Sequence, residues 1–318
     1  MSEVSDISCP YCHSNSHTHA FSTWSFESID YSIRNCHNCQ ARFLSPPPTA
    51  EVLALAYDDS YYGEGDTKFD GPVERILDGF RKKRATLLHR KLNGKGKVLD
   101  IGCGNGRFLD HMQKLGDYSI HGIEPEGLSA QRARQIESLE LKIGALEKGD
   151  FSPESLDAIT LFHVFEHLTE PKETMQIASE ILRPGGWLFM SFPNIGSWQA
   201  KVFKGNWLHL DPPRHLFLFR RQDFKTQMLE LGFEIVEERH FSLEYNPFGF
   251  CQSLLNKMTG QRDLLYESMK GDDSINPTTI FWHRLLTMCT VPLAIALDAL
   301  ASLFKSSATV FFILRKTS

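Results

Sequence analysis

The stretch VLDIGCGNGRF, residues 98–108, constrains the fold of this chain more than any other feature. A strand-like apolar pattern reaches Asp100, and glycines follow at alternate positions, Gly102, Gly104 and Gly106. Glycine turns of this kind join a strand to a helix and let the backbone pass close under a bulky ligand. A carboxylate at the end of the strand would repel a pyrophosphate, but it can accept a hydrogen bond from an ammonium group. The stretch therefore predicts a ligand with an ammonium group in place of a dinucleotide.

Segments with strand and helix patterns alternate after this turn. Strands are predicted at residues 97–102, 118–125, 156–164, 187–194, 233–243 and 308–316, and helices at 106–116, 127–139, 172–186 and 221–231. Strands with helices between them predict a parallel sheet covered on both faces. The second strand ends in Glu124, eighteen residues past Gly106, where an acidic side chain can accept hydrogen bonds from both ribose hydroxyls. An amino-acid head group, a ribose and no phosphate describe S-adenosylmethionine.

Four motifs in order resemble the signatures of class I S-adenosylmethionine-dependent methyltransferases: VLDIGCGNGRFL, GIEP, LDAITLFHVFEHLTEP and LRPGGWLFMSFPN. The resemblance implies an α/β fold with a Rossmann-like seven-stranded methyltransferase sheet, whose last strand, residues 308–316, runs antiparallel to the others. It implies that the cofactor is bound by Asp100, Gly102, Gly104, Gly106 and Glu124, by Ala145 and Leu146 around the adenine, and by Phe162 beside the methionyl part. Many relatives carry an aspartate in the adenine loop, so its absence here leaves adenine recognition to backbone groups.

Two CxxC pairs, separated by 23 residues, lie near the amino terminus. They are Cys9 with Cys12 and Cys36 with Cys39. Two such pairs at this spacing predict a small zinc ribbon over residues 1–45, with the four cysteines as ligands of a structural Zn²⁺. The amino-terminal residues lack the pattern of a signal peptide, so we expect a cytoplasmic protein, in which disulfides are rare.

Three prolines at residues 46–48 separate the ribbon from the rest of the chain. We expect residues 46–92 to form a linker and amino-terminal helices that act as a lid, with Tyr61 and Tyr62 over the cofactor. Residues 93–318 form the methyltransferase domain, and a substrate-cap insertion at residues 244–307 precedes its last strand.

The insertion contains a mostly apolar helix at residues 281–304 that Pro292 is predicted to interrupt. The longest uncharged run there, residues 285–297, has thirteen residues, fewer than the ~20 that a membrane span needs. The helix is interpreted either as a packed cap or as a lid that contacts a membrane surface or a lipid-like substrate such as a quinone precursor. The net charge of −5 argues against a nucleic-acid partner.

Four ionisable residues near the expected cofactor site are candidates for catalysis. His163, Glu166 and His167 have i, i+3, i+4 spacing, and His215 follows the fifth strand. One hypothesis is a divalent-metal site, which resembles the ExxEH plus distal histidine of small-RNA 2′-O-methyltransferases, with His163 in place of the first glutamate. A second hypothesis is a metal-free histidine base oriented by Glu166, and a third is a purely structural role.

Together these features predict a methyltransferase that acts on a small hydroxylated, sugar-like or quinone-like molecule. A ribbon before such a domain is similar to deoxysugar C-methyltransferases and to some polysaccharide-cluster and secondary-metabolite enzymes. Two alternatives remain at this point: an RNA methyltransferase, and a non-catalytic scaffold of the same fold that binds partner proteins through its zinc ribbon.

Overall fold

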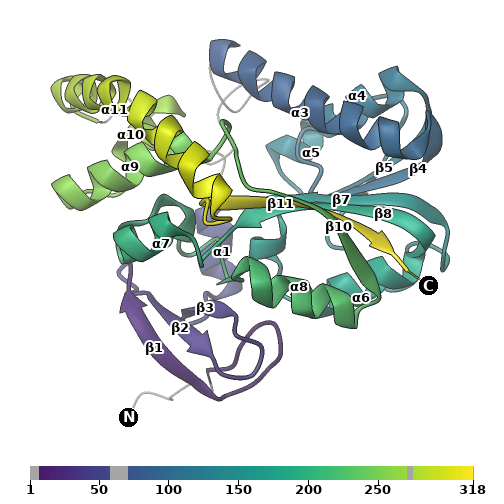
Figure 1. Cartoon of the computed structure of the whole chain (residues 1–318), viewed down its shortest axis with the longest axis horizontal. Helices are drawn as coiled ribbons and strands as arrows, with labels where there is room; N and C mark the ends of the chain where they lie inside the picture. The colour runs from purple at the N-terminus through teal and green to yellow at the C-terminus, as the bar shows by residue number, and fades with distance from the viewer. Residues whose placement is uncertain (1–6, 58–70, 271–274, 318) are drawn as a thin grey trace.

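The computed structural model describes residues 7–57, 71–270 and 275–317 of the 318-residue chain. In this part of the chain, one four-stranded sheet and one seven-stranded sheet form the framework on which the helices pack (Figure 1). The expected lid residues Tyr61 and Tyr62 lie outside the described residues.

The seven-stranded sheet has the order β10-β11-β8-β7-β4-β5-β6. Its strands are β4 (Lys95–Ile101), β5 (Asp117–Glu124), β6 (Leu139–Ile143), β7 (Leu156–Phe162), β8 (Leu182–Pro193), β10 (Phe233–Arg239) and β11 (Thr309–Lys316). β11 pairs antiparallel with both β8 and β10, so the predicted direction of the last strand is confirmed. β4 pairs in parallel with β5 on one side and β7 on the other. The strand order reverses there, which is where ligands bind in open α/β sheets.

Helices cover both faces of this sheet (Figure 1). One face carries α3 (Gly71–Leu92), α4 (Arg107–Leu115) and α5 (Leu128–Ala133), and the other carries α6 (Pro171–Ile181) and α8 (Arg221–Glu230). Two predicted helices are shorter than expected. α6 ends at Ile181 because Pro184 and Gly185, with φ of +75° at Gly185, disfavour a continued helix. α5 ends at Ala133, since the following residues turn the chain into β6.

The amino-terminal ribbon, residues 7–45, forms the second sheet. It contains β1 (His17–Ser22), β2 (Ser32–Cys36) and β3 (Arg42–Ser45), and its fourth strand, β9 (Phe217–Leu218), comes from the far side of the sequence. β3 pairs antiparallel with β9, and the rings of Tyr11 and Phe219 meet at 4.8 Å. The short helix α1 (Ala50–Ala56) follows the ribbon. The ribbon is thus joined to the body of the molecule by a shared sheet and a shared core.

The segment after β8 contains α7 (Trp198–Phe203) and the 3₁₀ turns η2 (Lys204–Asn206) and η3 (Leu208–Leu210). The insertion consists of α9 (Asn246–Thr259), α10 (Leu264–Met269) and α11 (Pro277–Leu303). The predicted interruption at Pro292 is wrong, because α11 is one helix of 27 residues with Pro292 inside it. Within the described part of the chain, α11 alone is long and apolar enough to cross a membrane, so the predicted shortfall in length is also wrong. The thirteen-residue estimate stopped at Asp298, whose carboxylate is buried and bonded within the protein.

Candidate active site

The glycine turn after β4 has the backbone geometry that its sequence predicts. Gly102, Gly104 and Gly106 have φ values of +70°, +57° and +73°, which residues with a side chain rarely adopt. A Cβ atom on Gly102 would overlap a methyl group of Val164, whereas one on Gly104 would meet no heavy atom within 4 Å. The turn is therefore packed on one side and open to a ligand at Gly104.

Two carboxylates stand at the ends of adjacent strands beside this turn. Asp100 is 3% exposed, and its Oδ1 accepts a hydrogen bond from Thr160 Oγ1 at 2.5 Å. Burial raises the pKa of Asp100 to about 8, although Thr160 and Arg84 oppose the rise. Glu124 is buried and accepts the N–H of Gly104 at 2.9 Å. A buried acid next to an open glycine turn fits the ammonium group of S-adenosylmethionine, because a bound cation would favour the ionised form of Asp100.

A cavity of about 570 Å³ opens above the turn, a volume typical of small-molecule sites. The predicted site residues that line it are Asp100, Gly102, Gly104, Phe162, His163, Glu166, His167 and His215. Gly106, Glu124, Ala145 and Leu146 are not among its lining residues. Gly106 caps α4, and Ala145 and Leu146 follow β6, where Ala145 is exposed and Leu146 is buried. The structure thus places the catalytic candidates and the glycine turn around one space.

Glu166 lies at the centre of the catalytic candidates, on the 3₁₀ turn η1 (Phe165–His167) directly after β7. Its side chain is 1% exposed, and its Oε1 lies 3.3 Å from Nδ1 of His163. Burial alone would raise the pKa of Glu166, but His163, His215 and His167 outweigh it and hold the pKa at about 2. Among the described residues, neither carboxylate oxygen has a hydrogen-bond partner. Glu166 is therefore a buried anion with free acceptor capacity.

The rings of His167 and His215 meet edge to face, with centroids 4.5 Å apart. Nδ1 of His167 lies 3.0 Å from the carbonyl oxygen of Arg214, and Nδ1 of His215 lies 2.8 Å from that of His209. A carbonyl oxygen only accepts, so each Nδ1 carries a proton and each Nε2 keeps its lone pair in the neutral ring. Burial, aided by the neighbouring His215, lowers the pKa of His167 to about 4. One donor atom from each of Glu166, His167 and His215 lies within 4.8 Å of the others.

Comparison with known proteins identifies the family at this point. Residues 74–238, just over half of the chain, match the sequence family described as a methyltransferase domain. The chain belongs to the class I S-adenosylmethionine-dependent methyltransferases.

Relatives of this methyltransferase include two enzymes named ubiquinone biosynthesis O-methyltransferase. The one from Albidiferax ferrireducens is 32% identical over 106 residues, which cover 31% of this chain and 41% of the relative. The one from Cupriavidus pinatubonensis is 29% identical over 176 residues, which cover 51% of this chain and 69% of the relative. The chain thus matches from two fifths to about two thirds of the length of these relatives.

A solved structure supports the fold assignment. It is a putative sarcosine dimethylglycine methyltransferase from Galdieria sulphuraria, with a TM-score of 0.51 and 14% identity over 84% of this chain and 97% of that one. At this level of identity the match concerns the fold alone.

Several residues that the sequence did not single out complete the cavity of this methyltransferase. Arg84, in the middle of α3, binds the Glu244 carboxylate through Nη1 at 2.6 Å and stacks over the ring of Phe162 at 5.0 Å. The ring of Tyr245 lies 4.0 Å from that of His163. His209 is buried, and burial together with His163 and His215 lowers its pKa to about 3. Residues so far apart in sequence carry no shared motif, so only the fold reveals their proximity.

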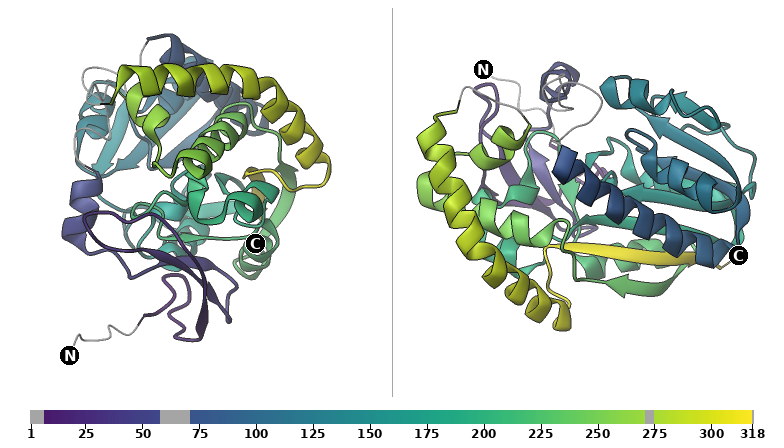
Figure 2. Two further views of the ribbon diagram at one scale, coloured as in Figure 1. Left: turned by 90° about the vertical axis from the view of Figure 1, so that its left-hand side faces the viewer. Right: turned by 90° about the horizontal axis from the view of Figure 1, so that it is seen from above.

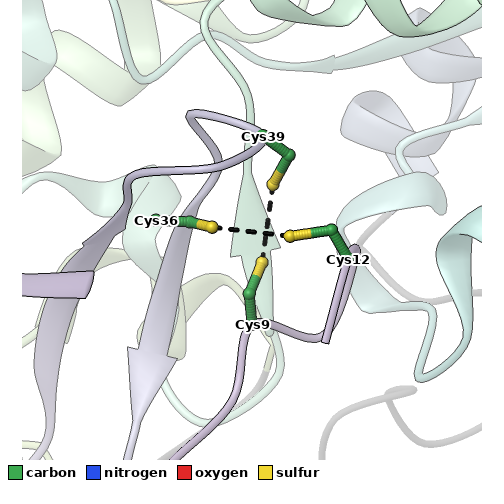
Figure 3. Close-up of side chains that lie close together, drawn as sticks. All are labelled: Cys9, Cys12, Cys36 and Cys39. Atoms are coloured by element: carbon green, nitrogen blue, oxygen red, sulfur yellow. Dashed lines mark hydrogen bonds between the residues drawn. The ribbon is translucent and has the colours of Figure 1, made fainter. Parts of the chain in front are cut away.

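The four cysteines of the ribbon converge as their spacing predicts (Figure 3). Sγ of Cys9 lies 3.6 Å from that of Cys39, and Sγ of Cys12 lies 3.5 Å from that of Cys36. These separations are too long for a disulfide, and all four cysteines are free. A tetrahedral zinc ion with Zn–S bonds of ~2.3 Å needs sulfur atoms about 3.8 Å apart, so the cluster fits zinc.

Proposed function

We propose that this methyltransferase transfers a methyl group to a hydroxyl of a small, quinone-like aromatic acceptor. The observation that carries the proposal is the shared cavity, in which the glycine turn faces the cluster of Glu166, His167 and His215. An O-methyltransferase needs both, because its acceptor hydroxyl must be aligned with the methyl group and must lose a proton. The names of the two ubiquinone-pathway relatives support the same reaction.

The wall of the cavity favours a planar aromatic acceptor over a sugar. Its lining includes six aromatic side chains: Phe80, Phe108, Phe162, Tyr245, Phe248 and Tyr266. Aromatic rings bind one another through edge-to-face and offset-stacked contacts, which suit a planar aromatic acceptor. Among the polar groups of the wall, the carboxylate oxygens of Glu166 have no hydrogen-bond partner in the described residues, so an acceptor hydroxyl can bind there.

Cofactor binding follows from the strand ends. S-adenosylmethionine supplies, when bound, an electrophilic methyl group on a positively charged sulfur. Asp100 would accept hydrogen bonds from its ammonium group, and Glu124 would accept them from the ribose hydroxyls. The turn at Gly104 lets the backbone approach the ligand closely. Backbone groups at Ala145 and Leu146 would contact the adenine.

We further propose that Glu166, His167 and His215 hold a divalent cation. Two imidazoles with free Nε2 lone pairs and one carboxylate form a set that suits metals such as Zn²⁺, Co²⁺ or Fe²⁺. The carbonyl groups that bind both Nδ1–H groups are the usual outer partners of metal-bound histidines. The ion would favour the ionised form of the acceptor hydroxyl. His163 would remain the ion-pair partner of Glu166.

The reaction is tested with the full chain, S-adenosylmethionine and a series of dihydroxylated aromatic acceptors, with release of S-adenosylhomocysteine as the readout. Turnover of a catechol-type acceptor and none of a nucleotide sugar is the expected result. Activity that a chelator removes and an added divalent ion restores supports the metal. Activity that survives chelation but is lost in His215→Ala supports a metal-free base. If no aromatic acceptor is methylated although the cofactor binds, the proposed acceptor class is wrong.

For the ribbon we propose a structural Zn²⁺ held by Cys9, Cys12, Cys36 and Cys39. Four thiolates leave no open position on the metal, which is the pattern of structural sites. In this proposal residues 1–45 form the metal-binding unit, and residues 93–318 carry the chemistry.

A further inference from the structure

One side of α11 is exposed and almost entirely apolar. Its exposed large side chains are Phe281, Trp282, Leu285, Met288, Leu293, Leu300 and Leu303, followed by Phe304 at the helix end, with exposures between 40% and 78%. Phe281, Leu285 and Met288 follow helical spacing, and Pro292, Ala296, Ala299 and Leu303 continue the same line. At 1.5 Å per residue this stripe is about 33 Å long. We call it the α11 face.

The opposite side of α11 is fixed to the protein. Ala294, Asp298 and Ala301 are buried there. Asp298 accepts hydrogen bonds from Asn246 Nδ2 at 2.9 Å and from the backbone N–H of Ser242 at 3.2 Å. A helix that crosses a bilayer would have to take this buried carboxylate out of its polar contacts and into hydrocarbon, which is costly. α11 therefore lies along the outside of the molecule, with α9 beneath it, as Figure 2 shows.

The chemistry of the α11 face fits lipid better than protein. Arg284 is the only charged residue of α11 on this side, because Asp298 is buried, and exposed Lys305 follows the helix. Protein interfaces contain about one hydrogen bond per 100–200 Å², and this face offers few groups to form them. Hydrocarbon requires none, and aromatic residues such as Trp282 are favoured at the boundary between lipid and water. The two cations suit acidic headgroups.

In sequence, α11 closely follows a helix that lines the active-site cavity. Tyr266 and Met269 of α10 line the cavity, and α11 begins at Pro277, eight residues after Met269. From this arrangement we propose that the α11 face docks on the surface of a lipid bilayer, with Arg284 and Lys305 toward the headgroups. The docking does not rest on the proposed function.

Vesicle flotation with the full chain tests the docking. Wild-type protein should float with vesicles of phosphatidylcholine and phosphatidylglycerol, and less with phosphatidylcholine alone. The double variant Leu285→Glu/Met288→Glu should bind at least ~10-fold more weakly, because it removes two large apolar contacts. Leu229→Glu on α8 is the matched control, since Leu229 is 60% exposed on another surface. Wild-type protein that stays out of the vesicle fraction, or a control that loses binding equally, overturns the proposal.

A second copy of the chain is the rival occupant of the face. Sedimentation velocity should show the same mass for wild type and double variant. A wild-type dimer that the double variant dissociates, without vesicle binding, overturns the lipid proposal. Methylation of a soluble, tail-less catechol should be unchanged in the double variant. Failure of that reaction in wild-type protein that still floats would contradict the proposed function and leave the docking intact.

Discussion

Two clusters of metal-ligand side chains in the described part of the chain differ in every property that decides what a site can do. The cysteine cluster offers four sulfur atoms from two short turns within the ribbon, and none of the four cysteines lines the cavity beside the glycine turn. The cluster of Glu166, His167 and His215 offers three donors of mixed type, and all of them line the cavity beside the glycine turn.

The difference separates a structural metal site from a site that can bind a substrate. Four thiolates satisfy a zinc ion completely, so all of the binding energy stabilises the surrounding chain. Three donors leave positions open on the metal, and an acceptor hydroxyl can occupy one. Removing the first site should therefore damage structure, and removing the second should damage rate alone.

The largest expected effect comes from the closed site. Cys36→Ser should remove the zinc and unfold the ribbon, because metal binding contributes on the order of 10 kcal/mol to folding in small zinc domains. Metal analysis and thermal unfolding measure this, with Cys289→Ser as the control because Cys289 is an exposed cysteine outside the cluster. A Cys36→Ser protein that retains zinc and its melting temperature would contradict the structural role.

The open site should respond in rate and not in stability. Glu166→Gln and His215→Ala should each lower kcat by roughly 10²–10⁴-fold, the usual range for loss of proton-transfer catalysis. Calorimetric titration with S-adenosylmethionine should give nearly wild-type affinity, which shows that the variants are folded. His13→Ala, at an exposed histidine of the ribbon, is the control. Unchanged kcat in both variants would assign the cluster a structural role.

Asp100 sharpens the comparison, because it is a buried acid that neither cluster contains. Its pKa of about 8 in the free protein means that it is protonated at neutral pH, and cofactor binding favours its ionised form. As the pH is raised toward 8, affinity for S-adenosylmethionine should therefore rise by up to about tenfold per pH unit. Above pH 8 it should fall again, because the α-ammonium group of the cofactor then loses its proton. Asp100→Asn should bind more weakly at pH 8 and lose this slope. The measurement is calorimetry between pH 6 and 9 on both proteins, and identical slopes would falsify the assignment.

The smallest effect should come from the hydrogen bond that Tyr57 forms with the open site. Its hydroxyl lies 2.8 Å from Nδ1 of His167, which also donates to the carbonyl of Arg214. Tyr57→Phe removes one of two acceptors, so kcat should fall less than about tenfold. Steady-state kinetics would detect this. A loss as large as that of His215→Ala would mean that Tyr57 contacts the acceptor directly.

The sequence predicted most of the fold and part of the site, for identifiable reasons. The glycine turn and Glu124 depend on local backbone and strand ends, so their pattern is visible in the sequence. The approach of His167 and His215 followed from spacing and topology. Arg84 and Tyr245 escaped prediction because α3 and α9 bring them to the cavity from distant segments. The apolar length of α11 was underestimated because burial of Asp298 cannot be read from its charge.

The pairing of β3 with β9 has a consequence for how the chain is made. During synthesis the ribbon leaves the ribosome before β9, so β3 is then an open edge that lacks its partner. Phe217 and Leu218 follow some 170 residues later, which corresponds to about 10–35 s at typical elongation rates. An unpaired apolar edge invites pairing with other chains. Arg42 and the short length of β3, four residues, limit that hazard until β9 arrives.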